Sequence, residues 1–168
     1  MAIHVYTGNG GGKTTAALGV ALRSAGWKRK TIFIQFMKGR PTGELNAAKK
    51  LAPLLEIRQF GGREFVNLRK PSNADKKRAR EALEYARKAL ADKPDLLVLD
   101  EANLAAAIGL VGPAEVLALA RAAPKKTRII LTGRNAPKEF VAAADFVSEI
   151  RDVKRPRASA KPVKGIEY

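Results

Sequence analysis

A glycine-rich stretch constrains this sequence more than any other feature. It reads Thr7-Gly8-Asn9-Gly10-Gly11-Gly12-Lys13-Thr14-Thr15. A short apolar run at residues 3–6 precedes it, and apolar side chains recur at helical spacing through residues 14–25. Glycines allow successive backbone N–H groups to point at one anion, and a helix N-terminus adds partial positive charge. The sequence therefore predicts a loop that binds nucleotide phosphates.

The residues of this loop have distinct expected roles. We expect Lys13 to point at solvent or ligand and to contact the phosphates, and the Thr14 hydroxyl to bind Mg²⁺. Thr7 stands where the usual motif begins with glycine, so ordinary hydrolysis of the γ-phosphate cannot be assumed. A merely flexible turn would not require Gly-Lys-Thr at the helix start. We expect ATP to contact the loop residues Thr7, Gly8, Asn9, Gly10, Gly11, Gly12, Lys13, Thr14 and Thr15.

Two adjacent carboxylates form the second candidate site. Asp100 and Glu101 follow the apolar run at residues 96–99, which has the composition of a central strand. With Thr14, they are the predicted ligands of Mg²⁺, and Glu101 is also a candidate to orient water. We therefore count Lys13, Thr14 and Glu101 as candidate catalytic residues. The alternative for Asp100 is a helix N-cap.

Strand-like and helix-like segments alternate along the chain. This order predicts an α/β fold, a P-loop NTPase-like, mostly parallel sheet with helices on both faces and the ligand at the carboxyl ends of the strands. We expect a single domain over residues 1–168, with a basic C-terminal tail at 152–168. Gly26 is expected to cap the first helix. The expected strands are 3–6, 31–36, 55–60, 96–99, 128–131 and an edge strand at 145–153; the expected helices are 14–25, 74–91 and 113–122, with a loop at 39–46.

Composition excludes several classes of protein. The chain has no cysteine, and its one histidine, His4, lies in an apolar segment where we expect it to pack. Hydrolases built on Ser-His-Asp or Cys-His are therefore excluded. The N-terminus lacks the pattern of a signal peptide, and no apolar stretch is long enough to span a membrane, so we expect a cytoplasmic protein.

The formal net charge of +16 raises a nucleic-acid alternative. Basic residues are distributed along most of the chain, however, and aromatic residues do not interleave with them. The charged side of the helix at 74–91 is first of all a solvated face. Nucleic acid is therefore a less favoured partner than a nucleotide.

With these landmarks the sequence resembles the P-loop corrinoid adenosyltransferases over nearly its whole length. The phosphate loop occurs in any P-loop protein, but its combination with residues 131–137, Leu-Thr-Gly-Arg-Asn-Ala-Pro, and with Gly-Ile-Glu-Tyr in the ending 164–168 is much more specific. Further matching blocks are residues 5–10, 12–19, 34–39 and 99–103, Leu-Asp-Glu-Ala-Asn.

The resemblance implies transfer of the 5′-deoxyadenosyl group of ATP to the Co(I) of a corrinoid in adenosylcobalamin synthesis or salvage. ATP would lie across the loop in a reversed sense, so that C5′ faces the cobalt and triphosphate leaves. The substrate would be cobalamin, cobinamide or cobyrinic acid diamide, a flavoprotein reductase would supply Co(I), and the protein would form a homodimer. Residues implied in binding the corrinoid or the nucleotide are Phe65, Asn103, Arg134 and Asn135.

Some positions depart from the family pattern. Gly11 replaces a lysine, Asn67 stands where an aromatic residue is frequent, and Arg155 lies in an altered C-terminal stretch. Phe65 has a second interpretation as a core residue. Beside adenosyl transfer, two alternatives therefore stay open, a P-loop NTPase that acts on or is regulated by nucleic acid and a nucleotide-binding regulator without catalysis.

Overall fold

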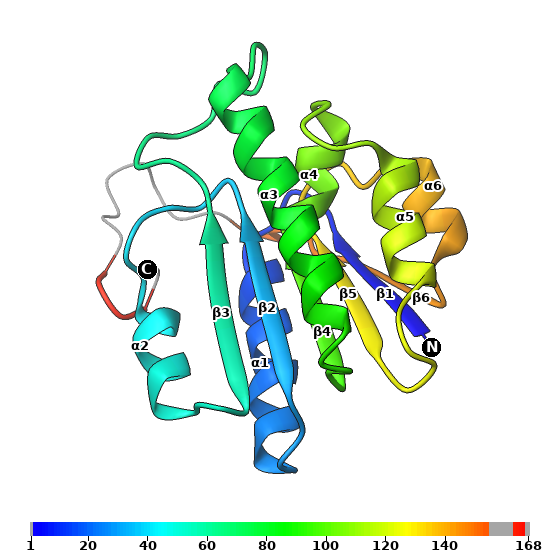
Figure 1. Ribbon diagram of the computed structural model, residues 1–168. Coiled ribbons are helices and arrows are strands. Elements are labelled where there is room, and N and C mark those ends of the chain that lie inside the picture. Colours follow the sequence, from blue (N-terminus) through cyan, green and yellow to red (C-terminus); the bar gives the residue numbers. More distant parts are fainter. Residues whose placement is uncertain (1, 155–162, 167–168) are drawn as a thin grey trace.

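The computed structural model describes residues 2–154 and 163–166, and within them six strands form one sheet whose paired neighbours are all parallel. The strand order is β3-β2-β4-β5-β1-β6 (Figure 1). The strands are β1 (Ala2–Thr7), β2 (Thr31–Phe36), β3 (Leu55–Phe60), β4 (Leu96–Asp100), β5 (Arg128–Thr132) and β6 (Phe146–Glu149). The helices are α1 (Lys13–Gly26), α2 (Gly43–Lys50), α3 (Asn73–Leu90), α4 (Ala102–Ala107), α5 (Pro113–Arg121) and α6 (Lys138–Ala143).

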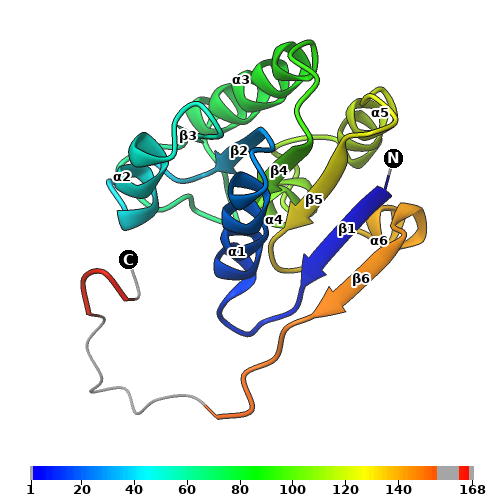
Figure 2. The ribbon, with the colours of Figure 1, turned by 90° about the horizontal axis from the view of Figure 1, so that it is seen from below.

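Side chains of the strands alternate between two hydrophobic cores. On one face Ile32, Ile34 and Phe36 pack with α3, α4, α5 and α6, while on the other Phe33 packs with α1 and α2. Figure 2 shows α1 on one side of the sheet and α3 and α5 on the other. Because both faces are covered, β2 and β4 are buried along their whole length. The predicted α/β class and the helices on both faces are confirmed.

Several sequence-based boundaries were wrong. Part of the expected loop at 39–46 is helix α2, which begins at Gly43. The packing of Ala48 against the sheet stabilises this helix. Gly26 is the last residue of α1 instead of a left-handed cap, and the positive φ of 55° falls on Lys28. The short helices α4 and α6 were not expected. Strand β6 ends at Glu149 because residues 150–152 leave the sheet and cross the phosphate loop.

His4 packs, as the sequence predicts. Its ring stacks on Phe146, with ring centroids 4.6 Å apart and planes 12° apart. Burial, followed by the charge of Arg128, lowers the pKa of His4 below its ordinary value. Among the described residues, no helix combines the length and apolarity that a membrane span requires.

Candidate active site

The phosphate loop links the carboxyl end of β1 to the first turn of α1. Gly12 is the N-cap of α1 with a φ of 97°, and Gly8 has a φ of 99°, so both adopt the left-handed conformation that glycine tolerates. Gly10 and Lys13 are buried, Thr7, Gly8 and Thr14 are half-buried, and Asn9, Gly11, Gly12 and Thr15 are exposed. The loop is therefore a strand-to-helix turn, which is the structural context that a phosphate site requires.

A segment from the other end of the sequence crosses this loop. Gly10 N donates to Ile150 O at 2.9 Å, and Gly11 N donates to the Asp152 carboxylate at 2.9 Å. A Cβ atom at Gly8 would lie 2.4 Å from Ile150 O. Position 8 thus requires glycine for two reasons. The backbone of Ile150 approaches too closely for a Cβ atom, and the positive φ strains other residues. The sequence did not indicate that residues 150–152 belong to the site, because 141 residues separate Gly11 from Asp152.

Lys13 does not point at solvent, which is one of the two directions expected from the sequence. Its side chain folds back over the loop, is only 7% exposed, and donates from Nζ to Gly8 O at 2.8 Å and to Gly10 O at 2.5 Å. Burial lowers the pKa of Lys13, while the charge of Glu101 partly opposes this shift. The lysine therefore stiffens the loop, and its contact with phosphate stays a prediction.

Asp100 is fully buried at the end of β4 and is the centre of a hydrogen-bond network. Its Oδ1 accepts from Thr14 Oγ1 at 2.9 Å and from Thr132 Oγ1 at 2.6 Å. Its Oδ2 accepts from Gln35 Nε2 at 3.2 Å and from Lys38 Nζ at 2.7 Å. Thr14 and Asp100, which we expect to bind the same Mg²⁺, are thus joined by a direct hydrogen bond, and their contact with the metal stays a prediction.

Lys38 is a site residue that the sequence reasoning missed. It follows β2, and its Nζ donates to Thr14 Oγ1 at 3.1 Å as well as to Asp100. Strands β2 and β4 are neighbours in register, with Gln35 paired to Asp100, so the residues after β2 lie beside the carboxylate. The available signal was the lysine in the family-like block at 34–39, but that block did not reveal which strand lies next to β2.

Glu101 follows Asp100 at the turn from β4 into α4. Its φ of 61° makes it the N-cap residue of α4, and its backbone N–H donates to Thr132 Oγ1 at 3.0 Å. The alternative in which Asp100 is the N-cap is therefore wrong. Burial, and next the neighbouring Asp100, raise the pKa of Glu101 above its usual range. The site holds a carboxylate whose charged form lacks full solvation.

The residues at this point fit a magnesium ion that is shared with phosphates. The Lys38 ammonium lies between Thr14 Oγ1 and Asp100 Oδ2, so the same oxygens already accept a positive charge. Within the described part of the chain, no three His, Cys, Asp or Glu side chains gather to hold a metal without help. Mg²⁺ commonly uses one or two carboxylates together with phosphate oxygens and water, which this donor set permits.

Asn103 and the loop after β5 hold the end of β1 in place. Asn103 is fully buried, and its Nδ2 donates to Tyr6 O at 3.1 Å and to Gly133 O at 3.0 Å. Asn103 therefore supports the backbone beneath the site. It does not lie on the site surface, where we expected it to contact the corrinoid or the nucleotide. Arg134 and Asn135 are exposed, and Asn135 has a φ of 53°. The contacts predicted for these two residues with a corrinoid or nucleotide stay predictions.

Phe65 lies on the loop that follows β3 and is 87% exposed. The core interpretation of Phe65 is therefore wrong, and its neighbour Val66 is the residue that packs against the core. Asn67 is exposed and caps its own turn by accepting from Arg69 N and Lys70 N. An exposed aromatic ring on a loop at the carboxyl ends of the strands is available to a large ligand.

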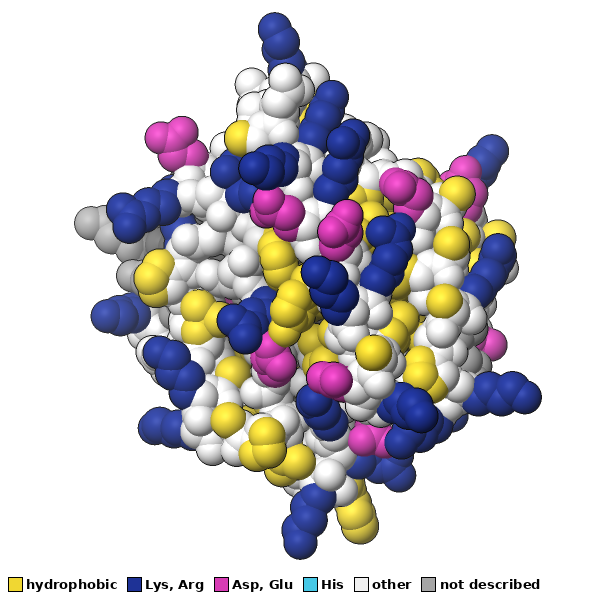
Figure 3. Space-filling view, in the orientation of Figure 1, with side chains coloured by type: hydrophobic (Ala, Val, Ile, Leu, Met, Phe, Trp, Pro, Cys, Tyr) yellow, Lys and Arg dark blue, Asp and Glu magenta, His cyan; other side chains and the backbone are white. Residues whose placement is uncertain are grey.

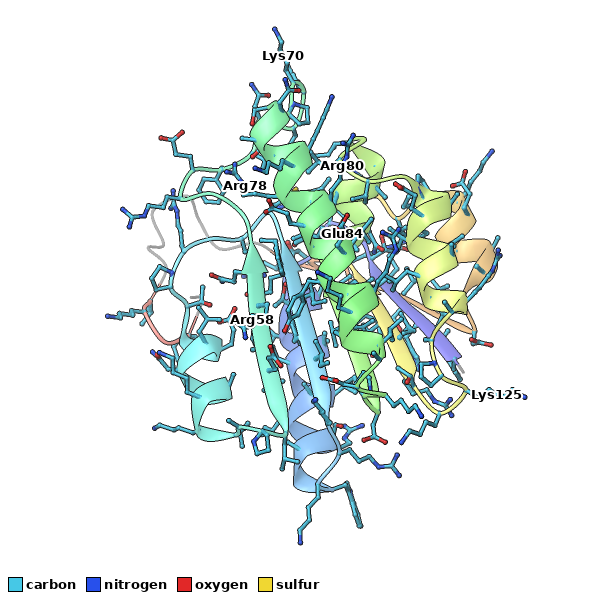
Figure 4. All side chains as sticks on the ribbon, viewed as in Figure 1. Arg58, Lys70, Arg78, Arg80, Glu84 and Lys125 are labelled. Atoms are coloured by element: carbon cyan, nitrogen blue, oxygen red, sulfur yellow. The ribbon has the colours of Figure 1, made fainter. Side chains whose placement is uncertain are left out.

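Charge is spread over the molecular surface. In Figure 3, Lys and Arg side chains are scattered across the visible face with Asp and Glu among them. A hollow of about 370 Å³ on α3 is lined by residues of both signs, among them Lys77, Arg80 and Glu84. Figure 4 shows Arg80 and Glu84 on the outward side of this helix. This mixture fits a solvated helix face, as the sequence indicates. Arg155 and the C-terminal Glu167 and Tyr168 lie outside the described residues.

Comparison with known proteins agrees with the resemblance. The family model described as ATP:corrinoid adenosyltransferase BtuR/CobO/CobP matches residues 1–168. The chain is 35% identical over 169 residues to a protein named corrinoid adenosyltransferase from Escherichia coli K12, covering 99% of this chain and 85% of the relative. It is 34% identical to the corrinoid adenosyltransferase CobA of Salmonella typhimurium LT2, with 99% and 85% covered. A relative of the same name from Pseudomonas aeruginosa is 34% identical, with 98% and 82% covered. The chain belongs to the ATP:corrinoid adenosyltransferase family.

Proposed function

We propose that this enzyme transfers the 5′-deoxyadenosyl group of ATP to the Co(I) centre of a corrinoid and releases triphosphate. The observation that carries the proposal is the set of positive groups at the phosphate loop, in a chain that matches the family from end to end. Lys13 lies on the loop, Lys38 lies 3.1 Å from Thr14 Oγ1, and the α1 N-terminus adds its own partial charge. These groups suit a reaction in which negative charge grows on a leaving polyphosphate.

The bonds of the proposed step balance without an acid or a base. An electron pair of Co(I) forms the Co–C5′ bond while the C5′–O bond breaks, and the oxygen leaves with its electron pair as triphosphate. The cobalt becomes formally Co(III). Because Co(I) is itself a strong nucleophile, the step needs no general base, which suits a chain that has no cysteine and whose only histidine is stacked on Phe146.

The chain's own residues would orient the nucleotide and stabilise the leaving group. Loop amides and Lys13 would bind the triphosphate, while Asp100, Thr14 and Glu101 would hold Mg²⁺. When bound, the metal supplies further positive charge to the phosphate oxygens. Phe65, Arg134 and Asn135 would face the corrinoid. We also propose that a flavoprotein reductase delivers the Co(I) state and that the enzyme acts as a homodimer.

Identification of the product from ATP tests this proposal. Anaerobic enzyme with Mg-ATP and a Co(I) corrinoid should yield triphosphate, which ³¹P NMR distinguishes from diphosphate and orthophosphate. ADP with orthophosphate, formed faster when DNA or RNA is added, would instead support the nucleic-acid-linked NTPase. Bound ATP without turnover for cobalamin, cobinamide or cobyrinic acid diamide would support the regulator. Lys13→Ala supplies the control for phosphate-loop dependence.

A further inference from the structure

Two loops at the carboxyl end of the sheet meet through an arginine and an aromatic ring. Arg40 lies between β2 and α2, and the carbon of its guanidinium group is 4.6 Å from the centroid of the Phe65 ring. The same side chain donates from Nε to Arg63 O at 2.6 Å. Phe65 is 87% exposed, so packing does little to restrain its ring. The contact with Arg40 fixes one face of the ring and leaves the other open.

The backbones of these two loops lie in close contact beside the Arg40–Phe65 pair. A Cβ at Gly39 would lie 2.4 Å from Gly61 O, and one at Gly61 would lie 2.3 Å from the carbonyl carbon of Met37. Met37 N also donates to Phe60 O at 3.2 Å. Arg40 therefore extends from a segment whose backbone lies against the loop that follows β3.

The segment at residues 37–40 also contains Lys38, which donates a hydrogen bond to Asp100. One residue, Gly39, thus separates the lysine that joins the predicted magnesium and phosphate site from the arginine that contacts Phe65. The segment at residues 37–40 thus contributes one residue to each part of the site. Such a connection suits a reaction in which two large substrates must meet in line.

We propose that Arg40 is a positioning residue that orients the Phe65 ring toward the corrinoid. This inference rests on the proposed function, because it assigns the open face of the ring to that substrate. The planar guanidinium group stacks on the ring while its Nε bonds to a carbonyl, two roles that a lysine ammonium does not combine. Arg40 therefore affects the corrinoid through Phe65 and not through ATP.

Kinetics of five variants, including one control, test the coupling. Under anaerobic conditions with saturating Mg-ATP, Arg40→Ala should lower kcat/KM for the Co(I) corrinoid about fivefold, the size expected for a partly exposed cation–π contact. Arg40→Lys should fall in between. In a Phe65→Leu background the Arg40→Ala change should have little further effect, because the two residues act as one unit. The KM for ATP should be unchanged, and Arg69→Ala, an exposed arginine of the same region, is the matched control.

A second readout does not depend on turnover. Aromatic NMR resonances of Phe65, assigned with Phe65→Leu, should change in Arg40→Ala and should shift on addition of cobinamide to the wild-type protein. Equal kinetics in Arg40→Ala, additive effects with Phe65→Leu, or a rise in the KM for ATP would overturn the inference. If no corrinoid reacts while the Phe65 resonances still depend on Arg40 and respond to cobinamide, the proposed function fails and the positioning role stands.

Discussion

The Nζ atom of Lys38 lies 2.7 Å from Oδ2 of Asp100 and 3.1 Å from Oγ1 of Thr14. Asp100 is fully buried, whereas the Lys38 side chain keeps 30% of its surface exposed. Burying a charged carboxylate lowers the stability of the fold unless a positive group or hydrogen bonds compensate for the lost solvation. Lys38 supplies that positive group, and it bonds to Thr14 and Asp100, the residues that we assign to magnesium. We therefore expect the lysine and the metal to share the Asp100 carboxylate.

Replacing Lys38 by methionine should separate these two roles. We expect Lys38→Met to lose at least about tenfold in adenosylation rate, because one positive group near the triphosphate is removed. Without metal the variant should melt at a lower temperature, and Mg²⁺ should raise its Tm more than that of the wild type, since the metal then compensates Asp100 alone.

Lys30→Met is the matched control, because Lys30 pairs with Asp92 at 3.1 Å at the surface. Thermal melts of the three proteins, with and without Mg²⁺, provide the measurement. An identical Mg²⁺ response in Lys38→Met and wild type would contradict a shared carboxylate.

Lys13→Ala should lower both activity and stability. The rate should fall at least about tenfold if the lysine contacts the phosphates. Because Lys13 Nζ bonds to Gly8 O and Gly10 O, the free energy of unfolding should also fall by about 1 kcal/mol. Urea unfolding and steady-state kinetics measure the two effects. A fully active Lys13→Ala enzyme would show that the triphosphate lies elsewhere.

Glu101→Gln should make the protein more stable and less active. The raised pKa of Glu101 means that folding disfavours its charged form, because burial and Asp100 both act against it. The cost is absent below the ordinary pKa of about 4.5 and grows as pH rises through the folded-state value. The Tm advantage of Glu101→Gln should therefore increase as pH rises from about 4.5 to the folded-state pKa and stay constant at higher pH. A variant that melts below the wild type at pH 8 would show that the charged carboxylate stabilises the fold.

Asp152→Asn should strengthen ATP binding. The Asp152 carboxylate accepts from Gly11 N, an amide that the phosphate loop is expected to offer to ATP. The negative charge of Asp152 also repels the triphosphate, by roughly 1 kcal/mol. Removing this charge should therefore lower the Kd for ATP about fivefold. Calorimetric titration of ATP tests this, with Asp92→Asn as a distant control. A weaker affinity would mean that Asp152 holds the loop in its binding conformation.

Local patterns were sufficient for some features of this enzyme and insufficient for others. Apolar runs and the glycine-rich loop predicted most of the strands and α1, because these depend on periodicity and on β–loop–α chemistry. Lys38 and Asp152 were missed because their partners lie 62 and 141 residues away and meet only through strand order. Helix α2 was missed because turn-forming residues precede it, while its buried contact, Ala48, depends on the sheet below.

The corrinoid product is the most direct test of the central claim. Purified enzyme is mixed anaerobically with Mg-ATP and chemically reduced cobalamin or cobinamide, and the Co(I) absorbance is followed before and after illumination. Adenosyl transfer predicts loss of the Co(I) band, formation of a light-sensitive alkyl-cobalt species, and one triphosphate per cobalt, all greatly slowed in Lys13→Ala. A Co(I) band that persists with each corrinoid while ATP is bound would contradict adenosyl transfer.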